Sequence, residues 1–205
     1  MPFRATIDVC SERANLRWFL LGSVLTGLRW LRGGRKAAAH GFSYSRNASV
    51  KILVYAMPFF LLPDQIVWML FIPPEYFYLR PLFIVGDIYA MLAIAGIIAT
   101  FDEFPHSIDG DIVTLRQGIL KCARLDRHSV LATDVIGTQF EKSTIKARGG
   151  KQAAYFLTSG APTVKLVLRT PVSIESIGGK SKFAEVIFVS VDEPQLFLAA
   201  LKTVP

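Results

Sequence analysis

Two aspartates that stand in otherwise apolar sequence are the residues best placed to do chemistry. Asp64 and Asp87 are almost equally far from the proline-containing segment 73–78, because their midpoint falls between residues 75 and 76. In two antiparallel helices joined at that segment, the two carboxylates would lie at similar depth. An ionised carboxylate in apolar surroundings is costly, so such residues usually face protein or water. The pair could handle a proton or a cation, or each could face a partner subunit or a polar crevice.

Basic residues form the second group, and they gather in the first 51 residues. That segment holds nine lysines or arginines against Asp8 and Glu12, in a chain of net charge +7. Such a cluster beside apolar sequence favours an anionic membrane surface over nucleic acid, for which no binding motif occurs. An acidic protein partner is the alternative. The residues expected at lipid headgroups, two tryptophans among them, are Arg17, Trp18, Arg29, Trp30, Arg32, Arg35, Lys36, Arg46 and Lys51.

The other reactive residue types form no recognisable site in the sequence. His40, His106 and His128 have no cysteine or acid at metal-ligand spacing. Neither GGK sequence has the spacing of a phosphate-binding loop, and no serine stands in a G-x-S-x-G turn. We therefore expect no metal, no cofactor and no enzymatic activity. The two cysteines, Cys10 and Cys122, are expected to be reduced.

The stretch 52–101 decides the class of the protein, because it contains only four charged residues. It is too long and too apolar for one core helix, and it fits a membrane hairpin over 50–101. The two spans are expected at about 50–72 and 82–101. Since the basic residues precede the first span, the positive-inside rule places both termini in the cytoplasm. The chain is thus predicted to be a multi-pass protein of the cell inner (plasma) membrane.

Residues 15–32 predict a further helix within the basic N-terminal segment 1–49. Its apolar run of about eleven residues is too short for a span, for which about 20 residues are needed. The flanking arginines and tryptophans indicate a helix that lies in the membrane interface. A short third span and a helix packed on the soluble domain are the alternatives.

From residue 102 the apolar pattern changes from helical to alternating. Residues 112–116 and 119–125 alternate on either side of a QG turn, which predicts a hairpin. Further short strands are expected within 129–140 and at 153–159, 163–169, 171–177 and 183–191. The last strand leads into DEPQLFLAALK, in which Asp192 is a suitable N-cap and Pro194 lies in the first turn. The segment 102–205 is thus expected to hold six or seven antiparallel strands and then one amphipathic helix.

Two motifs frame this strand region, PHSIDGDIVTLRQGIL at 105–120 and FAEVIFVSVDEPQLFLAAL at 183–201. With the membrane hairpin before them, they resemble uncharacterised bacterial integral membrane proteins that carry a C-terminal bacterial PH-like domain. The resemblance implies a PH-like antiparallel β-barrel with a C-terminal capping helix, and it implies no catalytic residues. The matching residues are His106, Asp109, Gly110, Asp111, Leu115, Arg116, Gly118, Asp192, Glu193, Pro194, Phe197, Ala200 and Leu201.

The expected fold class is therefore a membrane α-helical hairpin plus an α+β domain. The expected function is that of a non-enzymatic, membrane-anchored accessory or assembly subunit. Its cytoplasmic PH-like domain would bind a partner protein in a larger membrane complex, and its partners would be anionic lipids and other membrane-protein subunits. The alternatives are a lipid- or membrane-sensing module and an oligomeric transporter that uses Asp64 and Asp87.

Overall fold

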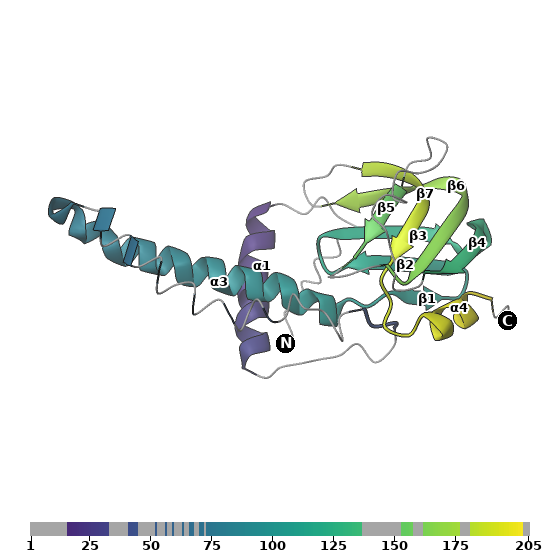
Figure 1. Ribbon diagram of the computed structural model, residues 1–205, viewed down its shortest axis with the longest axis horizontal. Helices are drawn as coiled ribbons and strands as arrows, with labels where there is room; N and C mark the ends of the chain where they lie inside the picture. Colours follow the sequence, from purple (N-terminus) through teal and green to yellow (C-terminus); the bar gives the residue numbers. More distant parts are fainter. Residues whose placement is uncertain are drawn as a thin grey trace.

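The chain combines a helix-rich region with a seven-stranded sheet, which makes it an α+β protein. In Figure 1 a long helix projects away from the sheet, and a second helix lies across that long helix. A short C-terminal helix covers one end of the sheet. The computed structural model describes residues 16–32, 41–44, 73–136, 153–157, 162–176 and 181–202, together with eight separate positions between 52 and 71.

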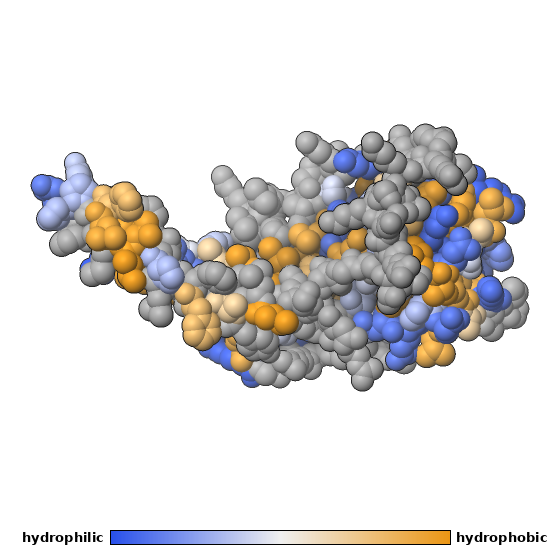
Figure 2. All heavy atoms as spheres, viewed as in Figure 1, coloured by the Kyte–Doolittle hydropathy of each residue, from blue (hydrophilic) through white to orange (hydrophobic). Residues whose placement is uncertain are grey.

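The projecting helix is α3 (Arg80–Glu103), and its 24 residues confirm the helix expected over 82–101. It is the one helix among the described residues that is long and apolar enough to cross a membrane. Its length is about 36 Å at 1.5 Å per residue, against about 30 Å for the hydrocarbon core of a bilayer. The 3-10 helix η1 (Pro74–Leu79) leads into it. Figure 2 shows hydrophobic side chains exposed along the projecting part.

Eight described positions fall within the first predicted span, and all of them are helical. Most of them are three or four residues apart, and the others are adjacent pairs, so they lie along one face of a helix. That face is apolar, and its side chains are exposed apart from the half-buried Ala56, which is the pattern of a helix in contact with lipid or another helix. The positions are Ile52, Ala56, Phe59, Pro63, Ile66, Val67, Leu70 and Phe71.

The sheet has the strand order β1-β2-β3-β6-β7-β5, with β4 paired to β6. Because this order has two ends, the sheet is open, and the closed barrel that we expected is not found. Every neighbouring pair is antiparallel except β5 and β7, which are parallel, so the prediction of an entirely antiparallel sheet was wrong. The strands are β1 (Ser107–Asp109), β2 (Ile112–Gln117), β3 (Lys121–Asp126), β4 (Val130–Val135), β5 (Ala153–Phe156), β6 (Val164–Ser176) and β7 (Ser181–Val189).

Strand β6 bends the sheet, and its 13 residues replace the two short strands expected around Pro171. One of its edges pairs with β7, with a shift of register between Val167 and Val172. Its other edge pairs with β4 in the first half and with β3 at the end. Pro171 lies within the shift, where its missing N–H costs no ladder hydrogen bond. The two halves of the sheet can therefore bury side chains against one core.

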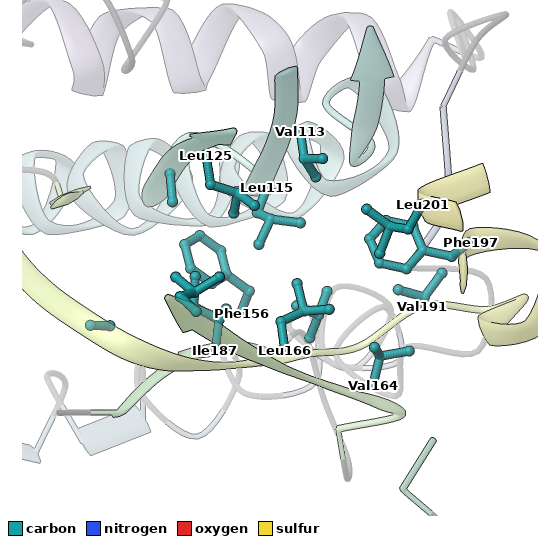
Figure 3. Close-up of a cluster of buried hydrophobic side chains, with 14 of the residues drawn as sticks. Val113, Leu115, Leu125, Phe156, Val164, Leu166, Ile187, Val191, Phe197 and Leu201 are labelled. Atoms are coloured by element: carbon teal, nitrogen blue, oxygen red, sulfur yellow. The ribbon is translucent and has the colours of Figure 1, made fainter. Parts of the chain in front are cut away.

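Helix α4 (Pro194–Lys202) closes one end of that core. Phe197 is fully buried, and in Figure 3 its ring and Leu201 lie beside Val191 at one end of the hydrophobic cluster. Arg127, itself buried, donates from Nε to the carbonyl of Leu201 (2.6 Å) and from Nη2 to the carbonyl of Ala200 (2.8 Å). These carbonyls have no partner within the helix, so Arg127 caps α4 and fixes it to the sheet.

Candidate functional site at the junction of α3 and the sheet

The structure tests the predicted acid pair only in part. Asp87 lies half-buried on α3, and Asp64 lies outside the described residues, so the pairing of the two carboxylates stays a prediction. An open cavity of about 540 Å³ borders the same part of α3. Its lining is Arg80, Pro81, Ile84 and Val85, and does not include Asp87.

The structure describes the side chains of three of the nine predicted headgroup residues. Arg29 and Arg32 are exposed at the end of α1 (Leu16–Leu31), whose bounds confirm the helix expected over 15–32. Trp30 is 8% exposed and packs against Ala95, Ile98 and Ala99 of α3, so its ring contributes to helix packing. The side chains of the others lie outside the described residues, namely those of Arg17, Trp18, Arg35, Lys36, Arg46 and Lys51.

Two glycines allow α1 and α3 to approach closely. A Cβ placed on Gly96 would overlap the backbone carbonyl of Ser23 in α1. A Cβ placed on Gly27 would likewise overlap the backbone carbonyl of Leu92 in α3. Figure 1 shows that α1 lies across α3 at this point. The helices therefore meet backbone to backbone, and neither glycine can be enlarged without moving a helix.

The C-terminal end of α3 joins the sheet through a very short connection. Helix α3 ends at Glu103, and β1 begins at Ser107. The extended segment 41–44 lies beside this connection, where Phe42 and His106 exchange two backbone hydrogen bonds of 2.7 and 3.1 Å. The same segment reaches the other end of the chain, because the N–H of Asp192 donates to the carbonyl of Ser43 (2.8 Å). Three distant parts of the sequence thus meet at one point.

His106 lies at the centre of this junction and is completely buried. Its Nδ1 accepts a hydrogen bond from the N–H of Arg116 (3.0 Å), so the proton is on Nε2, which lies 3.2 Å from the carbonyl of Ser190 and donates to it. Burial lowers the pKa of His106 from 6.5 to about 4, against the smaller opposing effects of the Ser190 carbonyl and Asp192. The ring is therefore neutral at pH 7, with both nitrogens engaged.

Tyr44 stacks on His106 and connects α3 to the first hairpin of the sheet. The two rings lie 4.4 Å apart, nearly parallel. The Tyr44 hydroxyl donates to the carbonyl of Phe104 (3.0 Å) and accepts from the N–H of Gly118 (2.6 Å). Burial raises the pKa of Tyr44 well above its ordinary value, so the hydroxyl keeps its proton. This one oxygen bonds both to the end of α3 and to the turn between β2 and β3.

The β2–β3 turn packs directly on α3. Gly118 has φ +52°, a conformation that favours glycine, and a Cβ there would collide with Thr100 and Phe101. Thr100 Oγ1 accepts from the N–H of Ile119 (3.3 Å) and donates to the carbonyl of Ile97 (2.6 Å). Ile119 is 4% exposed and packs with Ile97 and Phe104. The turn and α1 therefore hold α3 from two sides.

The polar side chains at the centre of the junction are engaged within the protein. Both nitrogens of His106 and the hydroxyls of Tyr44 and Thr100 are used in hydrogen bonds within the protein. Across the described residues, no group of three or more histidines, cysteines and acids is placed to hold a metal ion. What the site can do is transmit the position of α3 to the sheet.

Cys122 lies in β3, close to the junction, and differs from our expectation. It is 2% exposed and is disulfide-bonded, so the prediction of a reduced thiol was wrong for this residue. The only other cysteine in the sequence is Cys10, which lies outside the described residues. The spacing of the two cysteines, which are 112 positions apart along the chain, gave no indication that Cys122 would be bonded.

The sequence analysis singled out His106 only through a resemblance, and it missed Tyr44 and Thr100. Tyr44 stands in a polar, glycine-containing connector, and nothing local distinguishes it from a solvent-exposed residue. Thr100 gave a weak signal, because it is the last uncharged polar residue of an otherwise apolar helix.

Comparison of the chain with protein-family models, with curated proteins and with solved structures gave no match.

Proposed function

We propose that this protein is a non-enzymatic, membrane-anchored accessory or assembly subunit, whose sheet domain binds a partner protein in a larger membrane complex. The rigid junction carries the proposal. A domain that is joined to an apolar helix without a flexible linker is suited to presenting a surface in a fixed orientation. The resemblance to membrane proteins with a PH-like domain agrees with this role, although the open sheet differs from a closed barrel.

The surface formed by β4 and α4 is the proposed partner site. Strand β4 pairs with β6 alone among the strands that the structure describes, and we propose that a partner strand adds to its other edge. Leu131 of β4 and Leu196 of α4 are 61% and 59% exposed, and Val135 of β4 is 45% exposed. Apolar residues that gather on a soluble surface mark interaction sites.

Co-purification tests the proposal directly. The tagged full-length protein, extracted with a mild detergent, is expected to carry a stoichiometric set of membrane-protein subunits. Leu131→Glu and Leu196→Glu should release them, whereas Phe183→Glu, at a residue of similar exposure (58%) on β7, should retain them. A monodisperse protein that carries only lipid would contradict the proposal and favour a lipid-sensing module.

The side of the membrane on which the sheet lies needs a separate test. We propose the cytoplasmic side, because basic residues crowd before the first apolar stretch. The disulfide bond of Cys122 favours an oxidising compartment instead, since disulfides rarely persist in the cytosol. Rapid acid quenching of cells, followed by alkylation under denaturing conditions, measures how much of Cys122 is disulfide-bonded in the cell, and a mostly reduced Cys122 would support the cytoplasmic side. A fully oxidised Cys122 would place the sheet on the opposite side.

The acid pair distinguishes the accessory role from that of a transporter. We expect Asp64→Asn and Asp87→Asn to weaken assembly with partner subunits, because each carboxylate would face protein within the membrane. The measurement is the yield of the co-purified complex alongside proton flux in proteoliposomes. Intact assembly with a lost proton flux would favour the transporter.

A further inference from the structure

We infer that the end of the sheet that carries the β2–β3 turn rests on the bilayer, and that Lys121 and Lys182 bind the headgroups of anionic lipids there. The inference rests on the proposed membrane anchoring through α3. It adds a lipid contact made by the sheet domain itself, separate from the basic N-terminal segment and from the partner surface on β4 and α4.

The contact between the turn and α3 places this end of the sheet at the membrane boundary. Asp102 and Glu103 are the first charged residues after Asp87 on α3, so they mark where the helix leaves the apolar region. Ile97 precedes Asp102 by five residues, or about 7–8 Å along the axis. Because Ile119 of the turn packs against Ile97, the turn reaches past this boundary toward the hydrocarbon, and Leu120 packs beside Ile119.

Strand register brings two lysines to the same end of the sheet. Lys121 begins β3 directly after the turn and lies opposite Ser176, the last residue of β6. Lys182, near the start of β7, lies opposite Ile174. Lys182 is exposed, and the half-buried Lys121 reaches the carbonyl of Tyr155 with its Nζ (3.4 Å). Both ammonium groups therefore belong to the rim around the turn.

The opposite end of the sheet has no such relation to the membrane. Helix α4 closes it, and Arg127 fixes that helix. The charges of α1 and of the turn end, taken together, also favour an anionic surface. Five described basic residues on α1 and around the turn outnumber three acids there, and basic groups near an anionic leaflet are attracted to it. The basic residues are Arg29, Arg32, Arg116, Lys121 and Lys182, and the acids are Asp102, Glu103 and Glu175.

Photo-crosslinking from the turn tests the inference in the full-length protein. Benzoylphenylalanine is placed at Leu120, and the protein is reconstituted into nanodiscs of phosphatidylcholine with or without phosphatidylglycerol. We expect lipid adducts in both, with a severalfold higher yield for phosphatidylglycerol. Lys182→Glu should abolish that preference, whereas Lys202→Glu, an equal charge change at the α4 end, should leave it intact. A reporter at the exposed Phe183 repeats the measurement if Leu120 does not tolerate the label.

The outcomes separate this inference from the proposed function. No lipid adduct at either position, equal yields in the two lipids, or adducts to a protein in place of lipid would each overturn the lipid contact. Resistance of the protein to carbonate extraction is measured in the same samples. If carbonate removes the protein from the membrane, the proposed anchoring fails, and the lipid contact falls with it.

Discussion

Gly96→Leu will separate α1 from α3 and destabilise the protein by about 3 kcal/mol or more, because a side chain at this position meets the backbone of Ser23. The helices can relieve the overlap only by moving apart, which uncovers Trp30 and the alanines beneath it. The measurements are chemical unfolding in detergent and quenching of tryptophan fluorescence by acrylamide. Unfolding should occur at lower denaturant concentration, and quenching should increase.

Gly86 supplies the matched control, since it lies on the same helix and a Cβ there would have no atom within 4 Å. Gly86→Leu removes a glycine from a helix interior without an overlap, so its stability should equal or exceed that of the unchanged protein. Equal stability of Gly96→Leu and Gly86→Leu would show that α1 does not pack on α3 in this way.

Acid will weaken the junction, because His106 is neutral and buried in the folded protein. The unfolded chain takes up a proton near pH 6.5, whereas the folded protein resists protonation until the pH reaches about 4. The unfolded state therefore binds more protons in this interval, and stability falls as the pH falls through it. A pKa difference of this size corresponds to about 3 kcal/mol, present above pH 6.5 and lost by pH 4.

Unfolding at a series of pH values measures this loss, and two variants assign it. His106→Gln should flatten the dependence between pH 6.5 and 4, while lowering stability at pH 7 through the loss of the ring stacked on Tyr44. His128→Gln is the matched control for the replacement of a histidine, because the side chain of His128 is 66% exposed and lies outside the junction. A dependence that persists in His106→Gln would locate the effect elsewhere.

The sequence predicted those helices and strands whose formation depends on neighbouring residues. The helices at 16–31 and 80–103, the first hairpin and the C-terminal helix all follow from periodicity, length and turn residues. The short strand β1 was missed, because three residues are too few to show alternation. The continuous β6 was missed because Pro171 is a usual strand breaker, and here a shift of register accommodates it.

Pairing direction and the junction depended on contacts that local sequence does not encode. The run at 153–156 indicated a strand, but whether it would lie parallel to β7 depends on the path of the chain that leads to it. Tyr44 and its hydrogen-bond partner Phe104 are separated by 60 positions, and Tyr44 and Gly118 by 74. Such contacts arise from tertiary packing, so the sequence predicted the parts of the junction without predicting that they meet.

The short connection between α3 and β1 has a geometric consequence for evolution and for engineering. Each residue added to a helix turns everything beyond it by about 100° and lifts it by about 1.5 Å. Because the connection between α3 and β1 is too short to absorb that rotation, the length of α3 determines the direction, around the membrane normal, in which the β4 and α4 surface faces. One inserted residue would turn that surface toward a different neighbour. Four inserted residues would nearly restore the direction in which it faces and would change mainly its distance from the membrane.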